Sequence, residues 1–478
     1  MKVARFYIEN FGCRATQADG AALEQQFLER GLERARGTSD AEIVVLNTCT
    51  VTAGADKDAR ASIRRVQRVN PDCRILVTGC YAQRAPEELA TMPGVSWVVG
   101  NSHKHQAAEI ATASLASSGF IPLAQLAREA ASPQIVVGDI FAHTELMAAP
   151  VFEAANERTR PNLKVQDGCD NRCSFCVIPY VRGQSRSLPM RRVLTEVCTL
   201  VEAGYREVVI SGINLGRWGR DLESSSQFPV LSSQSAAGAE RPEISEQRLT
   251  HLIRAILSQT SLEKLRISSV EPMDWSDELI ELVASSPRIA KHAHVPLQSG
   301  SDAVLRRMHR KYRPWHYLKK ILKIREAMPY AAIGADVMVG FPGETDAEFA
   351  ETRHLIEELP FTYLHVFTYS ARPGTPAALA SKQVPAGVAR ERNSILREIA
   401  FAKKTVFLKA LVGRETEAIT LHSSGGDGFT EALTDNYLKA RLTETIDANQ
   451  WVRVRGEAVE GDALVGSVVS AREAVHST

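Results

Sequence analysis

The sequence lacks the features that would place a protein in a membrane or bind it to a polyanion through bulk charge. It has no uncharged apolar run of about 18 residues, the length that a spanning helix needs. The N-terminal residues include Arg5 and Glu9, so they contain no apolar signal core. The formal net charge is only +1. We therefore expect no membrane partner, a cytoplasmic location, and contact with any nucleic acid through a local basic patch.

Internal repeats at solenoid periods are also absent, which argues against a repeat architecture. The 478 residues, 44% hydrophobic and 24% charged, have the composition of a folded globular chain. Such a length suggests roughly two to four domains. In a reducing compartment we expect the eight cysteines to be metal ligands or catalysts rather than disulfides.

The N-terminal part of the sequence alternates short apolar runs with amphipathic stretches, which is typical of a parallel α/β sheet. The expected strands cover 6–8, 43–46, 75–77 and 97–99. We predict an N-terminal α/β domain over 1–110. Residues 111–157 are rich in Ala and Ser without a clear period, and we predict a linker there.

A second α/β series follows and predicts a central domain over 158–400. Its expected strands are 163–166, 207–212, 264–269, 292–297, 333–341 and 363–369. Six such units indicate a partial (β/α)6 barrel, in which chemistry takes place at the carboxyl ends of the strands. The Ser-, Pro- and Gly-rich stretch 222–247 is predicted as a loop inserted between two units.

The pattern changes again near the C-terminus, where 403–472 is predicted as a small all-β barrel. Short strand-like runs are VFLKALV, TEAITLH, GFTEALT, YLKARL, WVRVRGEAV and ALVGSVV. From Lys403 onward the chain has nine basic and eleven acidic residues, so this is not a basic domain.

Three cysteines with close spacing carry the strongest chemical signal. Cys169, Cys173 and Cys176 form C-x3-C-x2-C directly after the expected strand at 163–166. Three thiolates can hold three irons of a 4Fe–4S cluster. With no fourth cysteine in the loop, one iron keeps open positions for a chelating substrate. A zinc knot is the alternative, but zinc prefers four ligands and no second pair follows closely.

Three further cysteines each lie just past an expected strand. They are Cys13, Cys49 and Cys80. Carboxyl ends of parallel strands gather on one edge of a sheet, so these thiols can converge on a second cluster. The alternative is three buried structural cysteines. Cys73 and Cys198 lack this context and are predicted to be structural.

These motifs resemble known ones. The C-x3-C-x2-C loop, with Phe175 before its last cysteine, is similar to the radical S-adenosylmethionine (SAM) motif. The whole chain resembles the radical SAM methylthiotransferase family, in which a TRAM β-barrel follows the SAM barrel. The strings that carry the resemblance are NTCTVT, VTGCYAQ, QDGCDNRCSFCVIPYVRG, HVPLQSGSD, VMVGFPGET and TDNYLKA.

The resemblance implies two 4Fe–4S clusters, one on Cys169, Cys173 and Cys176 and one on Cys13, Cys49 and Cys80. It also implies two molecules of SAM, a sulfur donor and an electron donor such as flavodoxin or ferredoxin. The segments GCRATQAD and NTCTVTAGADKDARASIRR most resemble the branch that modifies N6-threonylcarbamoyladenosine beside the anticodon of tRNA. Arg-Ala-Thr stands where Lys-Val-Asn is common in that branch.

Three other functions stay open. Two are the same chemistry on isopentenyladenosine in tRNA and on an aspartate of a ribosomal protein. The third, of a different class, is an RNA-binding protein with structural metal, which would cleave no SAM.

Other residues near expected strand ends are candidates for a SAM pocket. They are Phe175, Ile178, Ser211, Gly212, Ser269, Glu271, Gln298 and Gly340. For the polar ones, an ordinary satisfied strand-end group is an equal alternative. His292 and His294 alternate on one strand, and we expect no metal there.

A basic stretch from 306 to 325 holds nine Lys or Arg and no acid, with Tyr312, Trp315 and Tyr317 interleaved. It predicts a phosphate-binding and stacking surface for RNA, whereas a solvated helix face is the alternative. The candidate RNA contacts are Arg306, Arg307, Arg310, Lys311, Arg313, Lys439 and Arg441.

Overall fold

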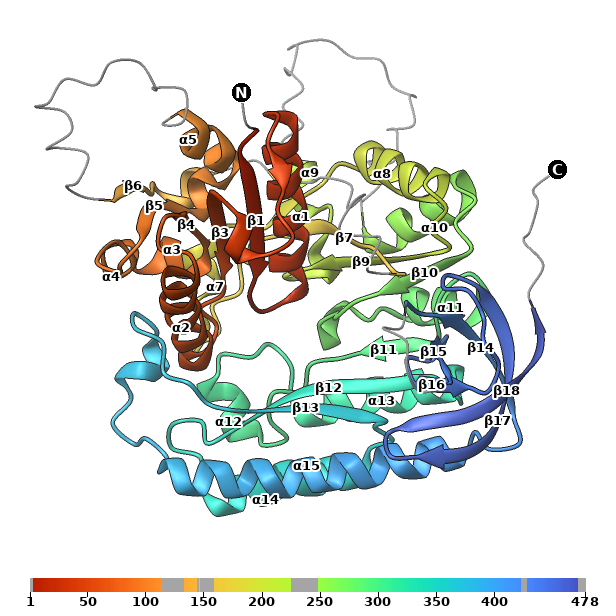
Figure 1. The fold of residues 1–478 in the computed structure, drawn as a ribbon. Coiled ribbons are helices and arrows are strands. Elements are labelled where there is room, and N and C mark those ends of the chain that lie inside the picture. Colours follow the sequence, from red (N-terminus) through yellow and green to blue (C-terminus); the bar gives the residue numbers. More distant parts are fainter. Residues whose placement is uncertain are drawn as a thin grey trace, which may run out of the picture.

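The computed structural model describes residues 3–113, 133–143, 146, 159–224, 248–422 and 428–471. An N-terminal α/β part, a central partial barrel and a C-terminal β-barrel lie against one another (Figure 1). The expected fold class is confirmed. No helix in these residues is long and apolar enough to cross a membrane.

The N-terminal part is a parallel six-stranded sheet in the order β2-β1-β3-β4-β5-β6. Its strands are β1 (Arg5–Asn10), β2 (Glu33–Arg34), β3 (Ile43–Thr48), β4 (Arg74–Gly79), β5 (Val95–Gly100) and β6 (Gln134–Val136). Every residue of β3 is buried, because helices cover both faces of a parallel sheet. The helices are α1 (Arg14–Glu29), α2 (Ala53–Val69), α3 (Cys80–Arg84), α4 (Pro86–Ala90) and α5 (Ala107–Ala113). Strand β6 falls within the stretch expected as a linker.

The central part has six parallel strands, as the six expected units predict. They are β7 (Asn162–Asp167), β9 (Glu207–Gly212), β10 (Lys264–Ile267), β11 (His292–His294), β12 (Ala332–Val339) and β13 (Tyr363–Thr368). A short strand, β8 (Arg186–Ser187), pairs antiparallel with β7. A bridge between Leu265 and Ile289 joins the β10-β9-β7-β8 sheet to the β11-β12-β13 sheet.

Helices surround these strands. They are α7 (Ile178–Arg182), α8 (Met190–Glu202), α9 (Arg220–Ser224), α10 (Leu249–Gln259), α11 (Asp277–Ser285), α12 (Asp302–Arg307), α13 (Pro314–Ala327), α14 (Asp346–Glu358) and α15 (Ala386–Lys409). Most of the insertion expected at 222–247 lies outside the described residues.

The C-terminal part is a closed barrel in the order β14-β15-β16-β18-β17, in agreement with the expected all-β barrel. The strands are β14 (Glu415–Thr420), β15 (Thr430–Thr434), β16 (Lys439–Leu442), β17 (Trp451–Glu460) and β18 (Ala463–Ala471). One expected strand is wrong, because VFLKALV runs through the last turns of α15. No Gly or Pro interrupts the helix between Gly387 and Gly413, and its Leu408 packs against the barrel residues Leu438 and Leu464.

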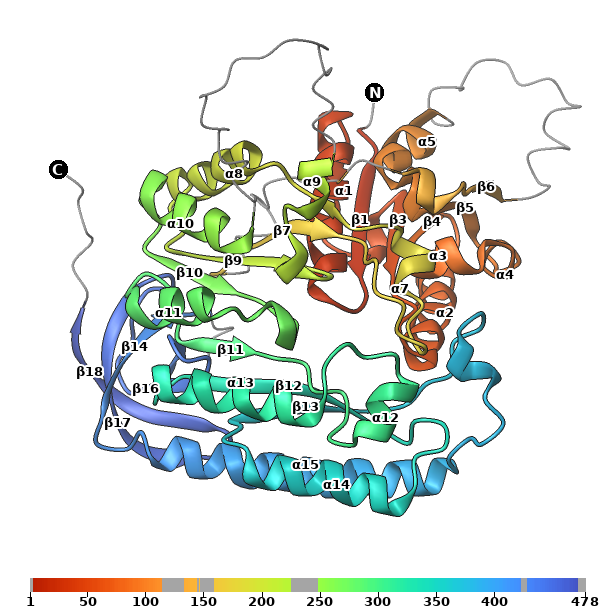
Figure 2. The same ribbon diagram turned by 180° about the vertical axis from the view of Figure 1, so that it is seen from behind.

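The three parts meet around the central strands. Figure 2 shows the N-terminal sheet beside β7 and the C-terminal barrel at the opposite end of the molecule from α2. Lys264 Nζ, at the start of β10, donates to Glu417 Oε2 at 2.7 Å, and Arg266 Nη1 donates to the Asp435 carbonyl at 2.9 Å. The C-terminal barrel therefore closes the amino ends of the central strands and leaves their carboxyl ends for the site.

Candidate metal centres and active site

The three N-terminal cysteines lie at the carboxyl edge of the parallel sheet. Cys13 is the N-cap of α1, Cys49 follows β3, and Cys80 begins α3 directly after β4. All three are free thiols. They are close enough that the charges of Cys80 and Cys13 act on Cys49. The topology therefore brings together residues that are far apart in the sequence.

Two glycines have the backbone that this convergence requires. Gly12 has φ +92°, and a Cβ there would lie 2.8 Å from the Cys49 sulfur. Gly79 has φ +100°, and its Cβ would lie 2.3 Å from the Thr48 carbonyl oxygen. Both positions adopt the left-handed region that side chains avoid. Glycine here leaves room for Cys49 and for the neighbouring strand end.

Polar groups lie beside two of these thiols, and burial keeps the third neutral when no metal is bound. Burial, followed by the neighbouring Cys80 and Cys13, raises the pKa of the Cys49 thiol to about 12. Asn101 Nδ2 lies 3.5 Å from the Cys80 sulfur, and Thr16 Oγ1 lies 3.5 Å from the Cys13 sulfur. Hydrogen-bond donors to sulfur are a means by which proteins tune iron–sulfur clusters. The residues present fit a cluster with thiolate ligands.

The second set of cysteines lies in the loop between β7 and α7. Cys169, Cys173 and Cys176 are half-buried free thiols in this loop, at the carboxyl end of a central strand. Burial raises the pKa of Cys169, and it raises that of Cys176 to about 12. Asn214 Nδ2 lies 3.6 Å from the Cys169 sulfur and Arg310 Nη1 lies 3.4 Å from the Cys173 sulfur. This donor set also fits a cluster.

Helix α7 connects the two sets. Cys80 packs in one apolar cluster with Val177 and Val181, at the start and within the helix, and Ile178 adjoins it. Asn101, which lies beside the Cys80 sulfur, donates to the Val181 carbonyl at 2.7 Å. The predicted SAM-pocket residue Ile178 therefore lies against the apolar cluster that contains Cys80. The loop that carries Cys169, Cys173 and Cys176 therefore leads directly into α7, and α7 packs against Cys80 of the N-terminal set.

The remaining SAM-pocket candidates all follow central strands, but their contacts differ. Ser211 Oγ, at the end of β9, is buried without a hydrogen-bond partner. Glu271 forms an ion pair with Arg310, and burial raises its pKa. Gln298 has φ +65°, a strained conformation for a side-chain-bearing residue. Gly340 N donates to Glu344 Oε2 at 2.7 Å.

The other three candidates pack against neighbouring side chains. The Phe175 ring meets Phe341 edge to face, with ring centroids 6.4 Å apart. Gly212 lies against Gln166, whose Oε1 would be 2.8 Å from a Cβ there. Ser269 is close to His294, with its Oγ 2.8 Å from Nδ1.

Three polar side chains of the central barrel come together from three different strands, and no motif in the sequence links them. His294 on β11, Asp336 on β12 and His365 on β13 bring donor atoms within 4.8 Å of one another. His294 Nε2 lies 3.3 Å from Asp336 Oδ1, and Ser269 orients the other ring nitrogen. Burial lowers the pKa of His365. Imidazoles beside a carboxylate can bind a metal or hydrogen-bond a polar substrate.

The basic stretch from 306 to 325 is not the expected open surface. Arg310 is buried beside Glu271 and the Cys173 sulfur, rather than exposed to solvent. Tyr312 and Tyr317 are also buried. Their hydroxyls donate hydrogen bonds to the carbonyls of Leu297 and Val295, respectively. Of the three interleaved aromatics only Trp315 is exposed.

Acidic side chains also pair with several of the positive charges in this stretch. Arg306 and Arg313 pair with Asp302, and Arg307 pairs with Glu348 at 2.8 Å. Lys311 is exposed. The burial of Arg310 therefore removes it from the candidate RNA contacts, whereas contact of the exposed Arg306, Arg307 and Lys311 with RNA stays a prediction.

The C-terminal candidates lie on β16. Lys439 is 69% exposed and lies 3.4 Å from Asp462. The Arg441 guanidinium lies over the Phe429 ring, 5.9 Å from its centroid. Both residues line a pocket of about 390 Å³ on the barrel.

Comparison with known proteins agrees with this geometry. Residues 163–356 match the Radical SAM superfamily, and residues 5–100 match the uncharacterized protein family UPF0004. A radical SAM methyltransferase, TsrM from Kitasatospora setae, shares the fold with a TM-score of 0.54 at 14% identity, covering 79% of this chain and 77% of that chain. The central barrel with its cysteine loop is that of a radical SAM enzyme.

Relatives over nearly the full length narrow the family. The threonylcarbamoyladenosine tRNA methylthiotransferase MtaB of Bacillus subtilis is 37% identical over 93% of this chain and 92% of its own length. MtaB of Aquifex aeolicus is 34% identical over 95% of this chain and 100% of its own. A tRNA-2-methylthio-N(6)-dimethylallyladenosine synthase of Mycobacterium ulcerans is 31% identical over 98% of this chain and 81% of its own. This chain belongs to the radical SAM methylthiotransferase family.

Proposed function

We propose that this protein inserts a methylthio group at carbon 2 of N6-threonylcarbamoyladenosine next to the anticodon of tRNA. The observation that carries the proposal is the contact of two three-cysteine sets through α7. Methylthiolation needs a carbon radical and a sulfur source near the same substrate atom, and two adjacent clusters can supply both.

In this proposal Cys169, Cys173 and Cys176 hold one 4Fe–4S cluster, and Cys13, Cys49 and Cys80 hold the other. When bound, the first supplies the electron for reductive cleavage of SAM and the second supplies the sulfur, while another SAM provides the methyl group. Arg310 and Asn214 would orient and hydrogen-bond the sulfurs of the SAM-cleaving site. A sulfur donor and an electron donor such as flavodoxin or ferredoxin complete the reaction.

The substrate branch is supported by the polarity of the barrel interior. His294, Asp336 and His365 offer hydrogen-bonding groups where a threonylcarbamoyl group could be accommodated. An apolar dimethylallyl group would desolvate these groups without satisfying them, which costs free energy. Three relatives that are 33% to 37% identical are also named for threonylcarbamoyladenosine, whereas relatives named for dimethylallyladenosine are 31% and 32% identical.

The proposed domains are an N-terminal methylthiotransferase domain over 1–110, a radical SAM barrel over 158–400 and a TRAM barrel over 403–472. Strand β6 of the sheet lies in the linker proposed between the first two, so the linker would also contribute an edge strand. The SAM pocket would be formed at the carboxyl ends of the central strands, where Ser211, Ser269, Glu271 and Gln298 lie.

The first experiment counts iron after anaerobic reconstitution. We expect about eight irons per chain in the wild type and about four in the Cys13→Ala/Cys49→Ala/Cys80→Ala variant. A Cys73→Ala/Cys198→Ala variant is the matched control and should keep both clusters. If the wild type holds only about four irons, the two-cluster function is refuted.

The second experiment identifies the product. The reconstituted enzyme is incubated with SAM, a reductant and tRNA that carries either threonylcarbamoyladenosine or dimethylallyladenosine, and the nucleosides are analysed by mass spectrometry. We expect the methylthio product only from the first tRNA. Product from the second alone would overturn the proposed substrate. If SAM is cleaved with neither tRNA, the result would favour an RNA-binding protein with structural metal.

A further inference from the structure

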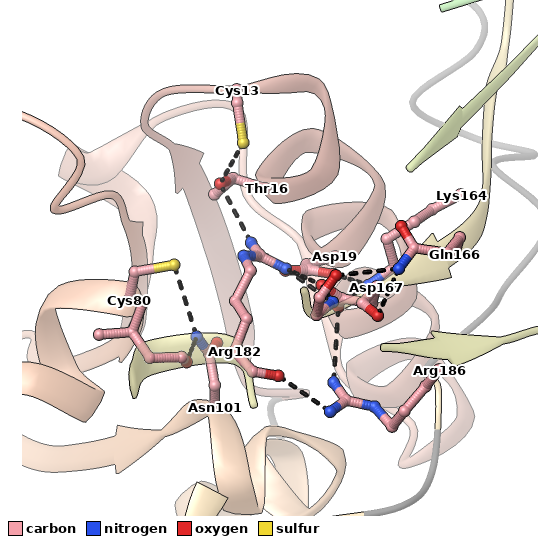
Figure 3. Close-up of polar contacts among 12 residues, drawn as sticks. Cys13, Thr16, Asp19, Cys80, Asn101, Lys164, Gln166, Asp167, Arg182 and Arg186 are labelled. Atoms are coloured by element: carbon pink, nitrogen blue, oxygen red, sulfur yellow. Dashed lines mark hydrogen bonds and ion pairs between the residues drawn. The ribbon is translucent and has the colours of Figure 1, made fainter. Parts of the chain in front are cut away.

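A buried network of charges lies between the N-terminal sheet and the central barrel (Figure 3). Asp19 on α1 accepts hydrogen bonds from Lys104 at 2.9 Å, from Arg182 at 3.0 Å and from Lys164. Asp167, at the end of β7, accepts two hydrogen bonds of 3.0 Å from Arg182 and one of 2.9 Å from Lys164. None of these five side chains is more than 9% exposed.

The network has more positive than negative charge. Lys104, Lys164 and Arg182 are three cations, and Arg186, 4.0 Å from Asp167, is a fourth. Asp19 and Asp167 are two carboxylates, so two positive charges are in excess. Burial lowers the pKa of Lys104, and Arg182 acts in the same direction although Asp19 opposes both. An uncompensated charge in a protein interior costs several kcal/mol. The network therefore needs an anionic neighbour.

The N-terminal cysteines are that neighbour. Thr16 Oγ1 lies 3.5 Å from both the Cys13 sulfur and Arg182 Nη2, so one hydroxyl links the thiol to the guanidinium. Cys80 packs against Val181, the residue before Arg182. The oxidised core of a 4Fe–4S cluster is dicationic, so three thiolates make the whole assembly a net anion.

We propose that Arg182 is a positioning residue that sets the reduction potential of the N-terminal cluster and fixes that cluster against the loop of the SAM-cleaving site. The inference rests on the N-terminal cluster proposed above. A nearby positive charge stabilises the more negative, reduced state of a cluster and so raises its potential. Arg182 Nη1 donates to both carboxylate oxygens of Asp167, which precedes Cys169 by one glycine, whereas Nη2 donates to Asp19. The same guanidinium is therefore tied to the second cysteine loop.

The test changes the net charge of the network in both directions in the holoenzyme. Arg182→Gln leaves three cations against two carboxylates, and Asp19→Asn leaves four against one. The double variant leaves three against one and so restores the wild-type excess of two. Arg182→Lys keeps the charge and loses the fork of donors. Iron per chain is measured first, and each cluster is then titrated by electron paramagnetic resonance, with added SAM to identify the SAM-binding signal.

We expect the potential of the N-terminal cluster to fall in Arg182→Gln and to rise in Asp19→Asn. Each shift should be at least tenfold in the reduction equilibrium, which is about 59 mV for one electron. The double variant should return most of the way to the wild-type value, and Arg182→Lys should stay close to it. The other cluster should shift less in all four variants, and Arg310→Gln should lower its potential instead.

A merely structural role gives a different pattern. It predicts that both single variants lose iron or stability and that the double variant is worse than either. Equal potentials in wild type and fully loaded Arg182→Gln would overturn the inference. If Arg182→Gln holds no iron, the Asp19→Asn shift decides, because only an electrostatic role predicts a rise. A wild type without the N-terminal cluster would refute the proposed function itself.

Discussion

Asp19 gives the most direct test of how the N-terminal sheet and the barrel are held together. Its carboxylate is 3% exposed and accepts hydrogen bonds from three cations on three different elements. Burial alone would raise its pKa, but Lys104, Lys164 and Arg182 hold that pKa well below the ordinary value. Asp19→Asn keeps the shape and an acceptor oxygen while removing the charge.

The expected loss of stability follows from the buried cations that lose the negative charge of Asp19. Without the Asp19 charge, Lys164 and Arg182 keep only the carboxylate of Asp167, and Lys104 loses its ion-pair partner. Removing one partner of a buried ion pair costs about 3–5 kcal/mol, because the remaining charge is uncompensated. In the metal-free protein we expect the free energy for opening the contact between α1 and β7 to fall by this amount.

Amide hydrogen exchange followed by mass spectrometry measures this opening locally. Peptides from α1 and α7 should exchange roughly a hundredfold to a few thousandfold faster in the variant, at about 1.4 kcal/mol per tenfold. Glu357→Gln is the control, because it breaks a surface pair with Arg353 that is 41% exposed on the Glu357 side. That pair is worth about 0.5 kcal/mol. The reasoning is refuted if Asp19→Asn exchanges no faster than this control.

Three further predictions follow from the same structure. The folded-state pKa values of Asp19 and Asp167 lie below the ordinary value of about 3.9. Their ion pairs therefore contribute stability that is complete above that pH and is lost below it, so wild type and Asp19→Asn should converge in acid unfolding curves. Because burial raises the pKa of Cys49, its thiol is neutral near pH 7 and iron binding must release a proton; iron loading should strengthen as pH rises, and pH-independent loading would contradict this. Replacing Lys439 and Arg441 with Ala should weaken tRNA binding and reduce its salt slope by about 1–2, whereas Arg353→Ala should change neither.

The sequence was sufficient to predict the parts of the site that depend on strand ends. Cys13, Cys49 and Cys80 each follow an apolar run, and parallel strands bring such positions to one edge whatever their separation in the chain. The Cys169 loop can be predicted from the spacing of three cysteines within one short segment. The order of the three parts follows from hydrophobic periodicity, which is likewise a property of short windows.

The charged network could not be predicted in the same way. Asp19 and Arg182 are 163 positions apart, and a charged side chain in an amphipathic stretch normally lies on the surface. Nothing local distinguishes Lys164, on a buried strand, from an exposed lysine. The ion pairs of the basic stretch at 306–325 could not be predicted for the converse reason, because a count of charges along the chain omits partners such as Glu348 and Asp277 that come from other helices.

Helix α7 explains why these unpredicted residues matter for the chemistry. It is only five residues long and begins two residues after Cys176, so it has little freedom to move independently of the cysteine loop. One side packs on Cys80 through Val181, and its last residue is held by carboxylates from both α1 and β7. The separation of the two cysteine sets is therefore held by this short, mostly buried helix. Such an arrangement suits a reaction in which one substrate carbon must meet a radical and then a sulfur without leaving the site.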